Sequence, residues 1–308
     1  MDTTLNGLLV LDKLTGITSR QAVDRASRWF PRGTRIGHTG TLDPLATGVL
    51  VLCVGDATRL VEYVQDMSKS YHSCFRLGAT SDSDDADGTV QPVSDAVPPS
   101  LDTLRETLKS FCGVIEQIPP TYSAARVSGQ RAHQLARRGE SVSLTARQVT
   151  IHNIELLRYD YPEVEVIVHC GKGTYIRSLA RDLGTRLGCG GYVATLRRLR
   201  VGPFTPEQAV PLDADRQTAR SRLLPLALAL AELPRWTADT DQIARLRRGQ
   251  SLALPPGFAT HEEATAIGLF DAVGQVVGVG RLDAKSGLLR PVKMLASWTS
   301  RPVSRETP

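Results

Sequence analysis

Residues 37–48, GHTGTLDPLATG, form the segment of this sequence that most favours chemistry. They place a single carboxylate, Asp43, among glycines and a proline. Pro44 disfavours helical backbone at Asp43 and keeps it extended, while glycine lets the chain turn sharply or approach a ligand closely. A carboxylate fixed on such a loop suits a nucleophile or a general base. A plain Asp-Pro turn is the other interpretation of the same spacing.

A second candidate is GKGTYIR, residues 171–177, between a predicted strand and a predicted helix. The GxxxxGK[ST] spacing of a phosphate-binding loop fails because Gly173 follows Lys172, which argues against an NTPase. Tyr175 and Arg177 stand at the start of the helix, outside its apolar stripe. Tyr175 could pack on a planar ligand. Arg177 is either solvated, which its position alone favours, or paired with a buried carboxylate.

Metal and disulfide chemistry is not indicated. The acidic run SDSDDADG, residues 81–88, breaks the order of calcium-loop ligands, so a solvated acidic turn is predicted. The six histidines form no HxxxH pair and the five cysteines no CxxC pair. We therefore expect no metal site and no disulfide framework, and the reducing cytoplasm is the expected location.

Hydrophobic patterns predict the elements that position these segments. Buried or alternating strands are predicted at residues 7–13, 48–55, 69–77 and 163–170. Helices are predicted to begin near Thr18, Ser100 and Thr174. Because strands and helices do not alternate strictly, an α+β fold is favoured over a doubly wound sheet.

The composition changes near residue 230. Leu233 and Pro234 begin a polar linker, and residues 243–249, IARLRRG, end a predicted helix with arginines and a glycine. Short β-like runs follow. We predict a first domain of residues 1–232 and a small β-rich domain of residues 233–308. No apolar run approaches the ~20 residues of a membrane span, so no membrane contact is expected.

The charge balance favours an anionic partner. The 308 residues include 37 Lys and Arg against 32 Asp and Glu, a net charge of +5. The arginine clusters are Arg137 with Arg138, Arg197 and Arg198 with Arg200, and Arg245 with Arg247 and Arg248. One such cluster is usually a solvated surface, but three favour a polyanion.

Several segments, in the same order along nearly the whole chain, resemble the TruB family, the bacterial tRNA pseudouridine synthases that modify uridine-55 in the T-loop. The segments that carry the resemblance are GLLVLDKLTGITS, GHTGTLDPLATGVL, KSYHSCFRLG, SDSDDADG, IPPTYSA, CGKGTYIRSLARDLG and LRRLRVGPF. The region after residue 230 resembles the PUA domain of these enzymes. The resemblance implies a mixed-sheet catalytic domain followed by a small PUA-like RNA-binding domain.

The resemblance also implies roles for individual residues. Asp43 matches the family's essential aspartate, Tyr71 the tyrosine that stacks on the target base, and Arg177 the arginine that pairs with the aspartate. Further residues implied in substrate binding are His38, Tyr175, Leu196 and Lys13. No metal and no cofactor is implied, because uridine and pseudouridine contain the same atoms.

The implied function is isomerisation of uridine-55 after the base has been flipped out of the T-loop. Asp43 would attack either C1′ of the ribose or C6 of the base, and the sequence leaves both open. The implied partner of this expected monomer is transfer RNA, bound by its T-stem-loop and, through the arginines of residues 245–248, by its acceptor end. The alternatives are a synthase of the same fold that acts on another RNA, and a non-catalytic tRNA-folding or RNA-binding protein.

Overall fold

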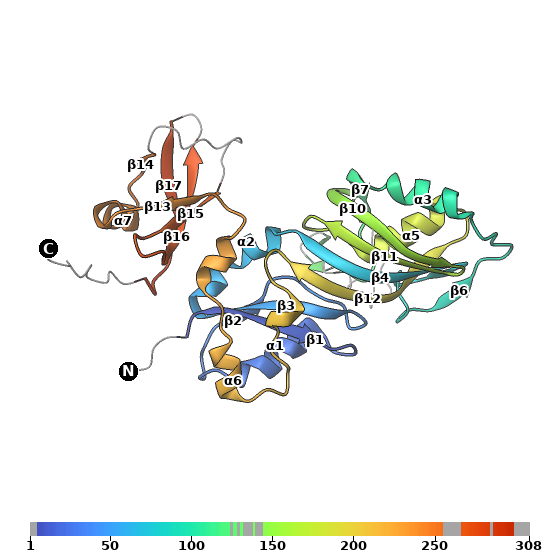
Figure 1. The fold of residues 1–308 in the computed structure, drawn as a ribbon, viewed down its shortest axis with the longest axis horizontal. Helices are drawn as coiled ribbons and strands as arrows, with labels where there is room; N and C mark the ends of the chain where they lie inside the picture. The colour runs from blue at the N-terminus through green and yellow to red at the C-terminus, as the bar shows by residue number, and fades with distance from the viewer. Residues whose placement is uncertain are drawn as a thin grey trace.

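A large mixed sheet and a small β-domain at one end form an elongated molecule (Figure 1). The computed structural model describes residues 5–123, 126–127, 130–131, 138, 144–254, 266–283 and 286–298. The large sheet has the strand order β1-β3-β12-β4-β11-β10-β7, with β2 paired to β3. Its strands pair antiparallel except for β12, which runs parallel to β3. The predicted α+β fold is confirmed.

The large sheet carries helices on its faces and ends. Its strands are β1 (Gly7–Lys13), β2 (Ile36–His38), β3 (Thr47–Val54), β4 (Lys69–Leu77), β7 (Gly113–Gln117), β10 (Arg147–Asp160), β11 (Glu163–Cys170) and β12 (Gly191–Val201). Two-stranded pairs are β5 (Ala79–Ser81) with β6 (Val90–Pro92) and β8 (Arg126–Val127) with β9 (Gln130–Arg131). The α-helices are α1 (Ser19–Ser27), α2 (Val61–Asp66), α3 (Leu101–Lys109), α5 (Ile176–Arg186), α6 (Arg216–Ser221) and α7 (Thr240–Arg247). The strands predicted at residues 69–77 and 163–170 are β4 and β11.

Strands β1 and β3 are buried on both faces, which explains their unbroken apolar sequences. One face packs into the main core through Leu9, Leu11, Leu50, Leu52 and Val54. The other face packs into a second core through Leu8, Val10, Val49, Val51 and Cys53. Since side chains alternate along a strand, each strand contributes neighbouring residues to different cores.

Gly48 lets β12 approach the loop that carries Asp43. Arg198 of β12 lies opposite Gly48 in the parallel pair. A Cβ atom at Gly48 would lie 2.2 Å from the carbonyl oxygen of Arg198, and the φ of Gly48 is +99°. Only glycine fits both conditions, so residues 37–48 can lie directly against β12.

The small β-domain shares the second core with the large sheet. Its sheet has the order β13-β15-β16-β17-β14. The strands are β13 (Arg235–Thr237), β14 (Leu252–Ala253), β15 (Ala266–Phe270), β16 (Val276–Asp283) and β17 (Leu288–Met294). Phe270, Val276, Val279 and Leu295 pack in one cluster with Leu8 and Val10 of β1. The short 3₁₀ segment Leu226–Leu230 joins the same cluster through Leu230.

Polar contacts also hold the small domain on the 3₁₀ segment η1 (Gly55–Leu60) and on α2. Lys293 of β17 donates to the carbonyl of Arg59 at 2.9 Å and pairs with the Glu62 carboxylate at 3.0 Å. The backbone N–H of Ser297 donates to the Asp56 carboxylate at 2.7 Å. The two domains are therefore joined by apolar and polar contacts together.

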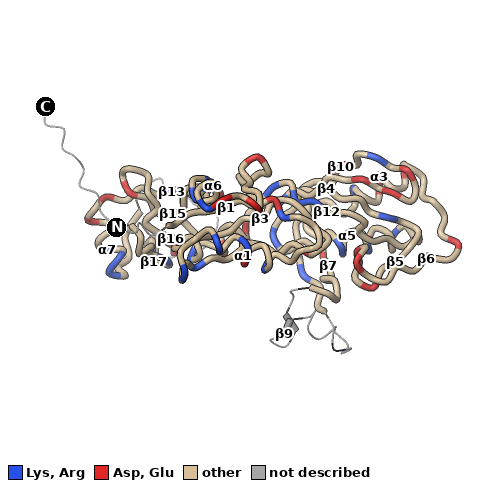
Figure 2. Tube along the Cα trace, turned by 90° about the horizontal axis from the view of Figure 1, so that it is seen from below, with Lys and Arg blue, Asp and Glu red and all other residues tan. Residues whose placement is uncertain are grey.

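Basic residues occur on both domains. Figure 2 shows Lys and Arg on α7 of the small domain and along the large sheet. Within the residues that the structure describes, no helix is long and apolar enough to cross a membrane.

The shared core predicts that residues 1–232 alone are less stable than the full chain. The cut removes Phe270, Val276, Val279 and Leu295 from the second core, and each such side chain contributes about 1.5–3 kcal/mol when buried. We expect the Tm of residues 1–232, followed by circular dichroism, to fall by more than about 5 °C. The Tm of the full-chain Lys293→Ala variant should fall by less, because this variant loses polar contacts and no apolar side chain of the second core. Equal Tm values for the truncated and full chains would contradict a shared core.

Candidate active site

A cavity of about 280 Å³ opens where the loop of residues 37–48 meets the start of α5. Five of the residues singled out from the sequence line it: Asp43, Tyr71, Tyr175, Arg177 and Leu196. Other lining residues include Gly40, Gln65, Lys69, Ser123, Gly171, Gly173 and Arg198. Among the described residues that line the cavity, Asp43 is the only carboxylate. The cavity is slightly smaller than sites for drug-sized ligands, which suits a single nucleotide base.

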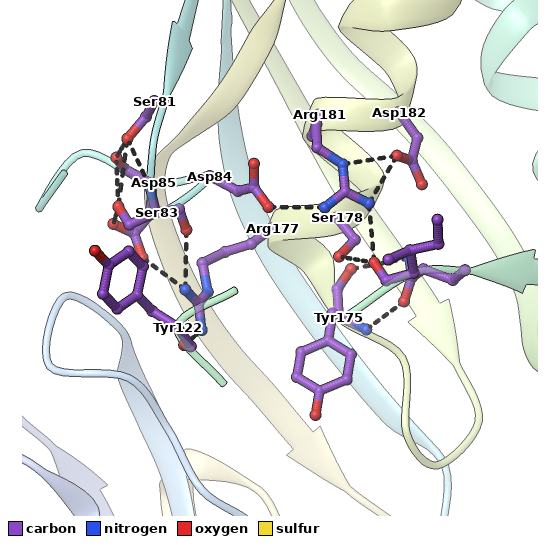
Figure 3. Close-up of polar contacts among 12 residues, drawn as sticks. Ser81, Ser83, Asp84, Asp85, Tyr122, Tyr175, Arg177, Ser178, Arg181 and Asp182 are labelled. Carbon is purple, nitrogen blue, oxygen red and sulfur yellow. Dashed lines mark hydrogen bonds and ion pairs between the residues drawn. The ribbon is translucent and has the colours of Figure 1, made fainter. Parts of the chain in front are cut away.

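Asp43 is held by a buried arginine. The Nε of Arg177 lies 3.0 Å from Oδ2 of Asp43. The same guanidinium donates to the carbonyls of Ser83 and Tyr122, both at 2.9 Å, and pairs with the Asp85 carboxylate at 3.3 Å (Figure 3). Arg177 is 4% exposed. The solvated interpretation of Arg177 is therefore wrong, and the pairing with Asp43 that the resemblance implies is present.

The acidic run of residues 81–88 is not the solvated turn that the sequence predicted. Asp85 is buried, and its carboxylate accepts from the Ser83 hydroxyl at 2.6 Å and from the Asp87 N–H at 3.1 Å. Asp84 adopts a φ of +61° and pairs with Arg181 of α5 at 2.9 Å (Figure 3). The prediction failed because the counterions come from α5, where Arg181 lies 97 residues after Asp84 in the chain. The acidic turn is therefore held in place by hydrogen bonds and ion pairs, and its Asp85 carboxylate contacts Arg177.

The charges around Asp43 act in opposite directions on its pKa. Burial raises the pKa of Asp43, Arg177 lowers it, Asp85 raises it again and Lys13 lowers it. The side chain keeps one third of its surface exposed, toward the cavity. The net effect is a pKa of Asp43 above its usual value, with burial the largest cause, and Arg177 acts against burial in favour of the charged form.

Tyr71 and Leu196 form the apolar part of the cavity wall. Both are buried, and they lie on the neighbouring strands β4 and β12. Burial raises the pKa of Tyr71, so its hydroxyl stays protonated at neutral pH. A flat base between these side chains would meet an aromatic ring and a branched aliphatic side chain.

Family models identify this architecture. One described as "TruB family pseudouridylate synthase (N terminal domain)" matches residues 28–176, and one described as "tRNA pseudouridylate synthase B C-terminal domain" matches residues 177–226. A relative from Xanthomonas campestris pv. campestris (strain B100), named tRNA pseudouridine synthase B, is 41% identical over 298 residues, with 94% of each chain covered. The chain belongs to the TruB family. A relative of the same name from Cereibacter sphaeroides is 42% identical over 297 residues, covering 94% of this chain and 96% of its own.

Solved structures show the same TruB-like architecture. A chain of the "Crystal Structure of a Cbf5-Nop10-Gar1 Complex" superposes with a TM-score of 0.72 at 25% identity, covering 97% of this chain and 85% of its own. A chain of the "Structure of H/ACA RNP bound to a substrate RNA containing 2'-deoxyuridine" has a TM-score of 0.71 at 23% identity, with coverages of 95% and 86%. The fold is thus a mixed α+β catalytic domain with a PUA-like β-domain at its C-terminal end.

Two residues expected in substrate binding lie outside the cavity lining of this TruB-family chain. Lys13 is fully buried, and its ammonium donates to the carbonyls of Leu14, Ile17 and Pro44 at 3.0, 2.7 and 3.4 Å. Burial lowers the pKa of Lys13 to about 8. Lys13 therefore stabilises the loop of Asp43 through the Pro44 carbonyl and does not line the cavity. His38 is half-buried in β2, opposite Leu52 of β3.

Tyr175 enters the site at the first turn of α5. Its backbone N–H donates to the side-chain oxygen of Gln117 at 2.8 Å, and the Gln117 amide donates back to its carbonyl at 3.1 Å. Gln117 is buried at the end of β7. Figure 3 shows the ring of Tyr175 pointing away from Ser178 of α5. The two hydrogen bonds with Gln117 fix the backbone of Tyr175, while its ring can face a ligand in the cavity.

The arginine cluster of residues 197–200 is not the exposed basic surface that the sequence favoured. Arg198 is buried, and donates to the carbonyls of Val49 and Gly40 at 2.7 and 3.0 Å. Arg197 forms a bidentate pair with Asp12 at 3.0 and 2.7 Å. Arg198 instead lines the cavity, and Arg200 alone of the cluster is exposed. The strand position of residues 191–201 could have signalled this, because alternate residues of a half-buried strand point inward.

The position of Asp85 predicts the direction of a pH shift. If Asp43 acts as an ionised nucleophile or base, as the family resemblance implies, activity falls as the pH drops through its pKa. The charge of Asp85 raises that pKa, and Asp85→Asn should therefore move the acid limb of kcat/KM to lower pH. The profile is measured on a T-stem-loop between pH 4.5 and 8. Asp82→Asn, on the same turn, is the matched control and should leave the limb in place. A limb that moves to higher pH in Asp85→Asn would contradict the electrostatic reasoning.

Proposed function

We propose that the cavity around Asp43 is where this member of the TruB family isomerises uridine-55 in the T-loop of transfer RNA to pseudouridine. The observation that carries the proposal is the ion pair between Asp43 and Arg177, inside a cavity of about 280 Å³. It supplies one ionised carboxylate beside an aromatic wall. Relatives with more than 40% identity over nearly the whole chain bear the name of this activity, which favours transfer RNA over another RNA.

The reaction needs the base to leave the RNA stack. A flipped uracil can lie against the Tyr71 ring and the Leu196 side chain, and stacking on an aromatic ring returns about 1–3 kcal/mol of the cost of flipping. Its reacting edge then faces Asp43. The carboxylate can reach either the ribose C1′ or the uracil C6, and both routes require it ionised.

The isomerisation conserves every atom of the nucleotide. The glycosidic bond at N1 breaks, the base turns, a bond from C5 to C1′ forms, and the proton on C5 leaves to the solvent as one returns to N1. No oxidant, reductant or phosphoryl donor enters this balance. The chain's own residues bind the base, orient it and hold the charge of the carboxylate.

We also propose that the small β-domain, residues 233–308, binds the acceptor end of transfer RNA. Arg245, Arg247 and Arg248 are exposed at the end of α7. Arg247 donates to the carbonyl of Trp298 and lies over its ring, so it also holds the C-terminal segment. We further propose that the protein acts in the cytoplasm, where transfer RNA is processed, and as a monomer, because Asp43, Tyr71 and Arg177 line one cavity of a single chain.

The central test is Asp43→Asn. The amide is nearly isosteric with the carboxylate but carries no charge, so turnover should fall below about 1% of the wild type while T-stem-loop affinity stays within about tenfold. Release of tritium from C5-labelled uridine measures the turnover, and filter binding measures the affinity. Asp24→Asn, which breaks only an exposed pair with Arg20 on α1, is the control. Residual activity above a few per cent in Asp43→Asn would reject the assignment.

The role of the small domain is tested with the double variant Arg245→Ala with Arg248→Ala. Lost phosphate contacts should raise the Kd for full-length transfer RNA several-fold and reduce the slope of log K against log salt by roughly 1–2. The affinity for an isolated T-stem-loop should not change, because it lacks the acceptor end. Arg20→Ala, an exposed arginine on α1, serves as the control. An equal loss of affinity for both RNAs would contradict acceptor-end binding.

A further inference from the structure

An ion pair bridges two segments that form the rim of the cavity. The Lys172 ammonium lies 3.0 Å from the Asp66 carboxylate. Lys172 belongs to the loop between β11 and α5, and Asp66 is the last residue of α2. Gly171 and Gly173, on either side of Lys172, line the cavity, and so does Gln65, next to Asp66. The pair therefore sits at the edge of the cavity and not on its floor.

The loop that carries Lys172 is fixed while its side chain is not. The backbone N–H of Gly171 donates to the Thr150 carbonyl at 2.8 Å, and the Thr174 hydroxyl donates to the Gly171 carbonyl at 3.2 Å. The Lys172 side chain is 67% exposed and that of Asp66 55%. An exposed pair of this kind contributes little to stability, so its partners can exchange at little cost.

The RNA must place phosphate at this rim. When the base and ribose of the target nucleotide occupy the cavity, the two phosphates that flank it are charged and hydrated and stay outside. Lys172 is an exposed cation between two lining residues, whereas Lys69 and Arg198 of the lining are buried and donate to backbone carbonyls. Asp66 has the opposite effect, because its negative charge repels phosphate and because its carboxylate pairs with the Lys172 ammonium in the free protein.

We propose that Lys172 binds a phosphate of the flipped nucleotide. In the free protein Lys172 pairs with Asp66, and a phosphodiester flanking the target uridine displaces the Asp66 carboxylate when the RNA binds. This inference rests on the proposed function of the cavity. Lys172 thereby contacts the phosphodiester backbone of the RNA and positions the nucleotide, while the cavity binds the base. No covalent step is involved.

The two partners of the pair should have opposite effects on binding. Lys172→Ala removes the phosphate contact and should raise KM for a T-stem-loop about three- to tenfold with little change in kcat. Asp66→Asn frees the lysine and removes a repulsive charge, so KM should fall or stay level. A merely structural ion pair would make both variants worse to a similar degree, which would overturn the proposal. Lys109→Ala, at the end of α3, is the control for loss of one positive charge.

Uncharged substrates identify the phosphate. Two T-stem-loops each carry one methylphosphonate, on the 5′ or the 3′ side of the target uridine. The wild type should lose about three- to tenfold in kcat/KM with one of them, and Lys172→Ala should not distinguish that RNA from the unmodified one. Equal sensitivity of the wild type and Lys172→Ala to both substitutions would overturn the proposal. Loss of the proposed function would show separately, as activity that survives Asp43→Asn.

Discussion

The buried guanidinium of Arg177 is the charge on which the site depends. A buried cation is tolerated when carboxylates and carbonyls surround it, and Arg177 has Asp43, Asp85 and the carbonyls of Ser83 and Tyr122. These partners lie on three segments that are distant in the sequence. One side chain thus fixes the loop of Asp43, the acidic turn and the segment before residue 123 relative to α5.

Local patterns predicted strands β1, β3, β4 and β11 and helices α1, α3 and α5, but not β7, β10 or β12, nor the polar contacts that join the elements. The alternating runs of β4 and β11 and the Asp-Pro loop were evident because each signal lies within a few residues. The hydrogen-bond partners of Gln117, Asp85 and Arg198 had no such local signal. Gln117 is 58 residues from its partner Tyr175, and Arg198 is 149 residues from its partner Val49. A buried polar residue is recognised by its partner, and a single sequence does not show that pairing.

Part of the positive charge of this chain serves the fold and not the surface. Lys13, Lys69 and Arg198 are buried near the cavity, and each donates to backbone carbonyls. Burial lowers the pKa values of both lysines to about 8. These cations satisfy buried carbonyls of loops, of the end of α2 and of β3 around the cavity, so they help to set the shape of its wall. Counting arginines and lysines therefore overestimates the charge available to RNA phosphates.

The double-sided burial of β1 and β3 has a consequence for synthesis on the ribosome. The face that carries Leu8, Val10, Val49 and Val51 is covered partly by residues from Ala229 to Leu295. Those residues emerge from the exit tunnel after every described residue that lines the cavity. A nascent chain that already contains every cavity residue still exposes an apolar strip of its central sheet, which is the kind of surface that chaperones bind and that promotes aggregation. The strip can close only after residues up to Leu295 have left the tunnel.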